Sequence, residues 1–212
     1  MIRRLPVYLL LDCSGSMTGE PIEGVRKGVE LLHQALLSDP AAMDTAHLSV
    51  ITFATEARIT PLTSLYDFQI PQIDADGWTA MGAALNLLAE SVEKDIRRKR
   101  SEEERGDYRP LVFLFTDGHP TDNDVFPAAA KRVKEMKWGK FVACGGGKNA
   151  DTNKLREITD DTILMMDELS QEKLKQFFKW VSGSIVSSVS PDGKQPPLPS
   201  GVVDLVKHPR NP

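Results

Sequence analysis

Five short stretches of the chain consist mainly of apolar residues and show no helical periodicity. They span residues 6–11, 46–53, 111–115, 141–144 and 162–166. Apolar stretches of this length are typical of strands that are buried on both faces of a parallel sheet. The first stretch ends abruptly at Asp12, where a loop begins. We therefore expect a buried sheet with residues 6–11 near its middle.

Between these stretches, apolar residues recur every three or four positions, which predicts helices that pack one stripe against the sheet. Thr18 is expected to cap the first helix and Asp122, with its neighbours, the third. The apolar stripes run over residues 22–36, 81–96, 130–136 and 174–185, with a shorter helix at 151–158.

A further strand is expected at Ala57–Leu62, only a few residues after the 46–53 stretch. That gap is too short for a crossover helix, so the two strands form an antiparallel hairpin. Pro61 cannot donate to a strand ladder and therefore places this strand at the sheet edge. The order of elements predicts an α/β, doubly wound, Rossmann-like fold. Its mostly parallel sheet has about six strands, one antiparallel edge strand, and helices on both faces.

The end of the chain differs in composition, because residues 190–212 contain six prolines. We expect a domain over residues 1–189 and an extended, proline-rich tail over 190–212. The apolar stretch 202–206 within the tail docks either on the domain or on a partner, and the sequence favours neither.

Charge and composition argue against some classes of function. The chain has 212 residues and a formal net charge of −4, which argues against broad nucleic-acid binding. The N-terminal apolar stretch is short for a signal peptide, and no stretch is long enough to span a membrane. Cys13 and Cys144 are expected two strands apart, roughly 9–10 Å, and so to be free thiols. These features predict a cytoplasmic protein.

Polar side chains follow two of the expected parallel strands. Asp12, Ser14 and Ser16 come directly after the first strand, and Asp117 follows the 111–115 strand. Right-handed crossovers put these two strands side by side, so both aspartates face one crevice at the switch point of the sheet. Thr79 lies in the loop before the second helix. Carboxylates with small hydroxyls suit Mg²⁺ or Ca²⁺ better than soft metals.

These three segments resemble the von Willebrand factor A domain and its metal-ion-dependent adhesion site. The pattern of that site is D-x-S-x-S, a threonine before the third major helix, and an aspartate after the fourth strand. Asp12, Ser14, Ser16, Thr79 and Asp117 fill it in order. The resemblance covers roughly Leu5 to Val189. The stretch 116–122, TDGHPTD, and the proline-rich end are similar to the TerY group of tellurite-resistance proteins.

The residues and the resemblance together imply a mode of action. Ser14 and Ser16 would bind Mg²⁺ directly, Thr79 directly once a ligand is engaged, and Asp12 and Asp117 directly or through water. Mn²⁺ and Ca²⁺ are alternatives to Mg²⁺. The ion keeps an open position, which the resemblance implies is filled by an Asp or Glu of a protein partner.

The resemblance also implies a wider setting. It points to a non-enzymatic scaffold in a bacterial tellurite or chemical-stress response. TerY-like proteins are encoded near a protein kinase and a metal-dependent phosphatase, which would be partners.

Simpler roles exist for each residue. Asp12 and Thr79 can cap helices, while the serines and Asp117 can be turn residues. His119 is expected to be exposed, and Trp78 to be a packing anchor rather than a ligand contact. The charged stretch 97–105 is expected to extend the second helix into solvent, with i, i+4 pairs from residues 98–100 to 102–104.

Two other functions remain open at this stage. Asp12 followed by Ser14 is similar to phosphatases that form an aspartyl-phosphate, although serine cannot replace their second acid near neutral pH. The stretch 14–19, SGSMTG, is similar to a hydroxyl-rich phosphate loop before a helix, which would suit a nucleotide or flavin. Asp12 and Asp117 would repel that phosphate unless a metal intervened.

Overall fold

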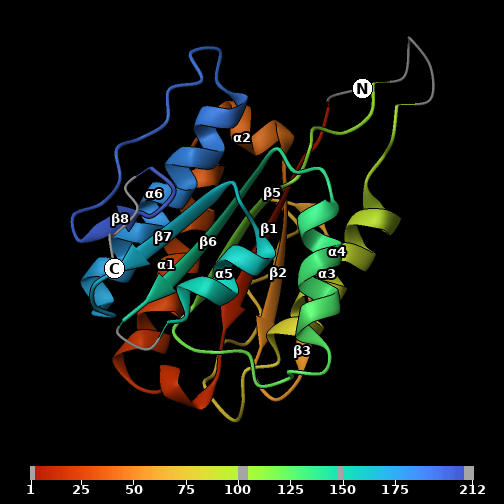
Figure 1. Cartoon of the computed structure of the whole chain (residues 1–212). Helices are drawn as coiled ribbons and strands as arrows, with labels where there is room; N and C mark the ends of the chain where they lie inside the picture. Colours follow the sequence, from red (N-terminus) through yellow and green to blue (C-terminus); the bar gives the residue numbers. More distant parts are fainter. Residues whose placement is uncertain (1–2, 100–104, 148–149, 208–212) are drawn as a thin grey trace.

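The computed structural model describes residues 3–99, 105–147 and 150–207, in which strands and helices alternate (Figure 1). The strands are β1 (Leu5–Asp12), β2 (Ala46–Phe53), β3 (Ala57–Ile59), β4 (Thr63–Ser64), β5 (Leu111–Thr116), β6 (Lys140–Gly146), β7 (Thr162–Met166) and β8 (Val202–Asp204). The α-helices are α1 (Glu20–Leu37), α2 (Pro40–Thr45), α3 (Met81–Asp95), α4 (Phe126–Glu135), α5 (Thr152–Ile158) and α6 (Gln171–Val189), and a 3₁₀ turn, η1, covers Gly15–Met17.

The strands form one sheet in the order β3-β2-β1-β5-β6-β7-β8, with β4 also paired to β2. The five central strands are parallel, while β3 and β4 at one edge and β8 at the other are antiparallel to their neighbours. This confirms the doubly wound, Rossmann-like fold. The described sheet has eight strands rather than about six, because two very short strands, β4 and β8, join it.

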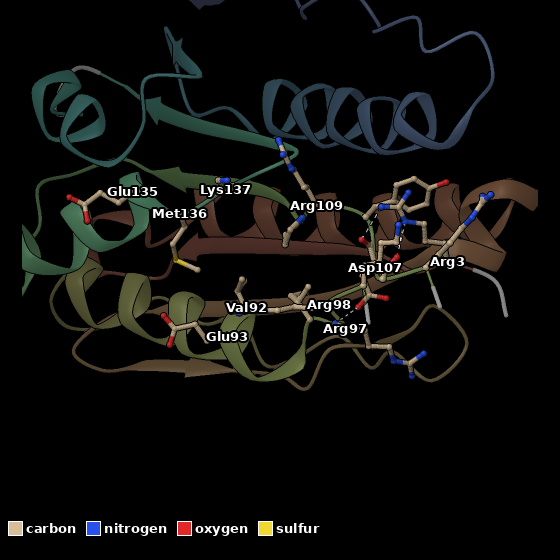
Figure 2. Close-up of a pocket in the computed structure, with 16 residues that line it drawn as sticks. Arg3, Val92, Glu93, Arg97, Arg98, Asp107, Arg109, Glu135, Met136 and Lys137 are labelled. Carbon is tan, nitrogen blue, oxygen red and sulfur yellow. Dashed lines mark hydrogen bonds between the residues drawn. The ribbon is translucent and has the colours of Figure 1, made fainter. Parts of the chain in front are cut away.

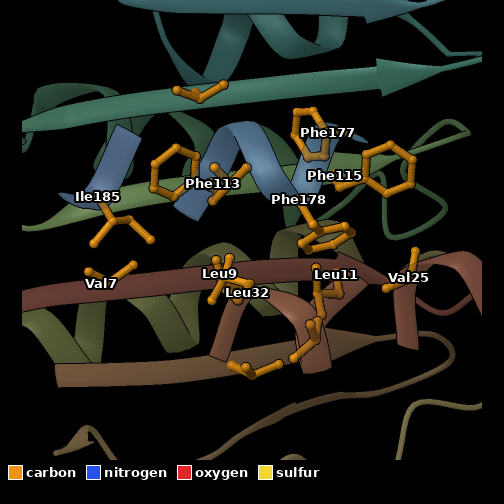
Figure 3. Packing of buried hydrophobic residues seen from close by; sticks show 14 of the residues in the cluster. Val7, Leu9, Leu11, Val25, Leu32, Phe113, Phe115, Phe177, Phe178 and Ile185 are labelled. Carbon is orange, nitrogen blue, oxygen red and sulfur yellow. The ribbon is translucent and has the colours of Figure 1, made fainter. Parts of the chain in front are cut away.

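β1 lies in the middle of the sheet and is buried along its whole length. Its odd-numbered side chains, such as Leu9 and Leu11, pack with α1, α2 and α6, and its even-numbered ones, such as Tyr8 and Leu10, with α3, α4 and α5. Figure 3 shows the first of these cores, where Phe177 and Phe178 of α6 lie over the sheet. Two covered faces explain why the strand reads as one continuous apolar run.

The edge hairpin is confirmed, but its second strand is shorter than expected. β3 ends at Ile59 and Pro61 lies between β3 and β4, outside both ladders. A proline without an N–H explains this break.

The expectation that the helix continues after α3 is wrong for residues 96–99. α3 ends at Asp95, and residues 96–99 are not helical. The side chain of Arg4 binds the C-terminal end of α3, since its Nη2 donates to the Asp95 carbonyl at 2.9 Å. The predicted pairs of residues 98–100 with 102–104 involve residues outside the described ranges.

The segment after α6 returns to the sheet. Trp180 Nε1 donates to the Pro196 carbonyl at 3.1 Å, and β8 pairs with β7 from Leu164↔Asp204 to Met166↔Val202. The apolar stretch 202–206 therefore docks on the body of the domain. This decides between the domain and a partner, the two docking surfaces that the sequence left open. A division into a domain of 1–189 and a tail of 190–212 stays a prediction. None of the helices in the described ranges is both long and apolar enough to cross a membrane.

Candidate metal centre

Asp12 and Asp117 lie at the carboxyl ends of neighbouring parallel strands. β1 and β5 pair from Val7↔Leu111 to Leu11↔Phe115, which brings Asp12 beside Thr116. The Thr116 hydroxyl donates to Asp12 Oδ2 at 2.5 Å. Thr116 was not among the expected site residues. The strand register was the signal that could have found it, because the residue opposite Asp12 follows directly from the pairing of the two strands.

Asp12 is a buried carboxylate whose partners are neutral. Its side chain is fully buried, and its other oxygen, Oδ1, accepts from the Ser14 backbone N–H at 2.8 Å. Among the described residues, no cation forms an ion pair with it. Burial raises the pKa of Asp12 to about 6, against the opposing effect of the hydrogen bonds from Ser14 and Thr116. A buried carboxylate of this kind favours a bound cation, which would replace its lost hydration.

Two hydroxyls join the loop after β1 to Asp117. Ser14 Oγ and Ser16 Oγ lie 3.1 Å apart, and Ser16 Oγ donates to Asp117 Oδ1 at 2.8 Å. Ser14 is buried and Ser16 is exposed, so the row of oxygens leads from the interior to the surface. Burial raises the pKa of Asp117, with the Ser16 hydrogen bond opposing the effect. The structure therefore brings four of the five expected side chains into one network.

Thr79 lies beside this network without joining it. A Cβ on Gly118 would be 4.0 Å from Thr79 Oγ1, which places the threonine over the Asp117 loop. In the described part of the chain, the Thr79 hydroxyl makes no hydrogen bond to the serines or Asp117. Its backbone is fixed, because Thr79 N donates to Thr121 Oγ1 at 3.0 Å and Thr121 N to the Thr79 carbonyl at 2.9 Å. Thr79 is not a helix cap, since Ala80 takes that position.

Asp122 holds the same two segments together at a second point. Its carboxylate accepts from Gly82 N at 3.1 Å and from Ala83 N at 2.9 Å, so it caps α3. The expectation that Asp122 caps its own helix, α4, is wrong, because Val125 takes the N-cap position there without a side-chain bond. The expected Thr18 cap is also wrong: Gly19 is the N-cap of α1, and the Thr18 hydroxyl donates to the Gly15 carbonyl.

Replacing Asp122 with alanine is expected to lower the free energy of unfolding by about 1 kcal/mol, because two N–H groups of α3 lose their partner. Urea denaturation would measure this change. Asp124→Ala is the matched control, since Asp124 is an exposed carboxylate two residues further on. Equal stability of the two variants would contradict a capping role for Asp122.

The expected exposure is wrong for the aromatic side chain beside the site and right for the imidazole side chain. Trp78 is 68% exposed, so the expectation of a packing anchor is wrong. His119 is exposed as expected, and its Nδ1 lies 3.2 Å from Asp151 Oδ2. Cys13 and Cys144 are buried, free thiols, which confirms the expectation.

One cavity between described residues lies away from this site. It has a volume of about 880 Å³ and lies at the opposite end of the sheet, where α3 and α4 end and β5 begins. Figure 2 shows Val92 and Met136 on its apolar side and Arg98 and Asp107 on its polar side.

The donor set fits a hard divalent ion. Two carboxylates and the hydroxyls of Ser14 and Ser16 form one network, the Thr79 hydroxyl lies beside it, and all are oxygen donors. In the ranges that the structure describes, no cluster of three or more His, Cys, Asp or Glu side chains could hold a metal. Hydroxyls in place of further carboxylates leave the charge of a bound ion only balanced, so it would remain able to attract another anion.

The fold and this site together define a doubly wound α/β domain with cation-type donors at the switch point of its sheet. The model of the von Willebrand factor type A domain matches residues 7–180. The chain therefore belongs to that family, whose members are often metal-dependent modules for protein interaction. The sequence matches no curated protein at a significant level.

Solved structures resemble the fold at low sequence identity. A von Willebrand factor type A protein from Catenulispora acidiphila is 16% identical with a TM-score of 0.65, over 87% of this chain and 43% of that one. Proximal thread matrix protein 1 from the mussel byssus, with a zinc-occupied metal-ion-dependent adhesion motif, is 19% identical with a TM-score of 0.60, over 85% and 48%. The pilus adhesin SpaC from Lactobacillus rhamnosus GG is 14% identical with a TM-score of 0.66, over 89% and 30%. This chain spans less than half the length of each.

Proposed function

We propose that the chain is a non-enzymatic, divalent-metal-dependent module for protein interaction. Asp12, Ser14, Ser16, Thr79 and Asp117 would hold the ion. The observation that carries the proposal is the fully buried Asp12, which has only neutral partners and lies at the end of a row of hydroxyls leading to Asp117.

The ion would supply an electrophilic centre with an open position. Mg²⁺ is the expected metal, with Mn²⁺ and Ca²⁺ as alternatives, and the zinc in the mussel protein is one example of a divalent ion in such a motif. Ser16 stands at the surface end of the oxygen row, next to Asp117. An Asp or Glu side chain from a protein partner is the ligand that suits the open position, because a carboxylate is a hard anionic donor.

The proposal contains no catalytic step. A phosphatase of the aspartyl-phosphate type needs a second acid two residues after the nucleophile, and that position holds Ser14. A nucleotide at the loop after β1 would bring its phosphates against Asp12 and Asp117. These arguments favour binding over catalysis.

The wider setting is also a proposal. The TDGHPTD stretch and the proline-rich end support a role as a cytoplasmic scaffold in a bacterial tellurite or chemical-stress complex, with a protein kinase and a phosphatase as partners. Affinity purification from stressed cells, with and without a chelator, tests this setting. The same proteins captured in both conditions would contradict a metal-dependent scaffold.

The metal site itself is tested by calorimetry. Mn²⁺ is expected to bind the wild-type protein, and Ser16→Ala is expected to lower the affinity by roughly tenfold, as loss of a group close to a metal typically does. Ser38→Ala is the matched control, since the Ser38 hydroxyl donates to the Gln34 carbonyl at the far end of α1. Equal Mn²⁺ affinity of wild type and Ser16→Ala would contradict the assignment.

A further inference from the structure

Trp78 is a large aromatic side chain that the fold leaves in water. Its exposed fraction is 68%, whereas Trp180 is only 6% exposed in the core. Leaving an indole ring in water forgoes the stabilisation that its burial would give. Most of the indole ring therefore contributes little to folding and is available for contact with a partner.

The loop that carries Trp78 is fixed to the loop of the candidate metal centre. Gly15 N donates to the Gly77 carbonyl at 3.0 Å, and Asp76 N donates to the Cys13 carbonyl at 2.9 Å. On the other side, Trp78 N donates to Thr55 Oγ1 at 3.3 Å. The Trp78 backbone is thus held between two loops, so the ring is presented from a fixed backbone and little backbone conformational freedom would be lost on binding.

Gly77 shows that this presentation is built into the loop. Its φ is +68°, in the left-handed region, and a Cβ at this position would overlap the Thr55 side chain. Only glycine fits both conditions without strain. The residue before Trp78 therefore sets the direction in which the chain leaves the metal loop, with the indole on the outside.

Trp78 is also the immediate neighbour of a proposed metal ligand. Consecutive Cα atoms are roughly 3.8 Å apart, so the indole starts one residue from Thr79. Thr79 faces inward, with an exposed fraction of 6%, whereas Trp78 faces outward. The Trp78 backbone therefore lies within one residue of a side chain that the proposal assigns to the metal, so a partner bound at the metal would have surface near this residue.

We propose that Trp78 is an anchor for the protein partner whose carboxylate completes the metal site, so that the partner carries an acidic residue beside an apolar pocket or side chain. This inference rests on the proposed function and adds a second recognition element to it. Exposed, rigidly held tryptophans at the centre of an interface are typical of residues that dominate binding energy. The metal selects the acid, and Trp78 selects what lies next to it.

A displayed library of random peptides tests the inference, selected on the full chain with Mg²⁺ and eluted with a chelator. Wild type is expected to enrich peptides in which an Asp or Glu has an aromatic or aliphatic neighbour. Trp78→Ser is expected to keep the acid and lose the preference for the neighbour. Its affinity for the best wild-type peptide, measured by calorimetry, should fall by roughly tenfold or more.

Tyr66→Ser is the matched control, because Tyr66 is also 68% exposed and lies earlier in the same long connection, with its hydroxyl bonded to Met43 Sδ. It should behave as wild type. Mn²⁺ affinity is measured for all three proteins, and is expected to be equal, which shows that the metal site is intact in Trp78→Ser.

The outcomes separate this inference from the proposed function. Metal-dependent enrichment of acidic peptides that is the same in wild type and Trp78→Ser would overturn the role of Trp78 alone. Mn²⁺ binding without any metal-dependent acidic peptide would overturn the capture of an acid, and the role of Trp78 with it. A dimer in sedimentation experiments that Trp78→Ser dissociates would identify a second copy as the occupant, and would also overturn the inference.

Discussion

Asp12→Asn is expected to change metal affinity and stability in opposite directions. Loss of the buried carboxylate should lower Mg²⁺ or Mn²⁺ affinity by more than roughly a hundredfold, which exceeds the usual effect of residues outside the coordination sphere. The metal-free variant should nevertheless be more stable than metal-free wild type at pH 7, by about 1 to 3 kcal/mol. Asparagine can still accept from Ser14 N and face the Thr116 hydroxyl, and it carries no buried charge.

The size and sign of the stability change follow from the pKa of Asp12. Burial raises that pKa from 3.8 to about 6, so between these pH values the folded protein binds more protons at this site than the unfolded chain. Stability contributed by this group therefore decreases as pH rises from about 4 to about 6, and stays low above that range. Because each tenfold change in proton affinity corresponds to about 1.4 kcal/mol, the full effect is about 3 kcal/mol at most.

Urea denaturation at pH 5 and pH 7.5, with a chelator or with Mg²⁺, measures both effects. Wild type should gain about 2.7 kcal/mol from Mg²⁺ at a hundred times its dissociation constant, and Asp12→Asn should gain less than about 0.4 kcal/mol at the same Mg²⁺ concentration. Asp124→Asn, which alters an exposed carboxylate, is the control and should follow wild type. If Asp12→Asn destabilised the metal-free protein, Asp12 would be a structural residue, and its assignment to the metal site would fail.

The central part of the fold could be predicted from the sequence because burial on both faces leaves a simple pattern. β1 and β5 are short apolar runs that end in an aspartate or a Thr-Asp pair, and right-handed crossovers leave one arrangement for them. The closeness of Asp12 to the Asp117 loop follows from this arrangement, and the bond between Ser16 and Asp117 reflects it.

The errors concern features that depend on contacts between distant loops. The Asp122 carboxylate can cap α3 or α4, and only the path of the chain after β5 brings it to the N-terminus of α3. The strand β8 has three residues in a proline-rich segment, so no periodicity marks it. It forms because the edge of β7 offers unpaired backbone groups.

The exposure of Trp78 could not be predicted for a similar reason. An aromatic residue in a loop is buried or exposed according to the direction of the backbone, which Gly77 and its contact with Thr55 decide here. Sequence patterns report average burial of tryptophan, not the direction of one residue. The sequence therefore indicates which polar residues lie near Asp12 more readily than it indicates which way one side chain of a loop faces.

Gly28→Leu is expected to lower the free energy of unfolding by about 2 to 3 kcal/mol. Gly24 and Gly28 form the face of α1 that lies against α6: a Cβ on Gly24 would be 2.7 Å from Leu174 Cδ1, and one on Gly28 would overlap the Phe178 ring. Phe178 is buried, so its ring has little room to move aside. Replacing a helical glycine gains at most about 1 kcal/mol of helix propensity, and the cost of overpacking is larger.

Gln34→Leu is the control, because it places the same side chain at an exposed position of α1 and should leave stability nearly unchanged. A double-mutant cycle gives the sharper result. Phe178→Ala alone should be destabilising through a cavity, but Phe178→Ala in the Gly28→Leu background should cost less, because leucine fills part of the space. Additive effects would mean that α1 and α6 are not in contact at Gly28. Since α1 begins directly after the loop of Ser14 and Ser16, a loosened α1 should also weaken Mn²⁺ binding in Gly28→Leu and not in Gln34→Leu.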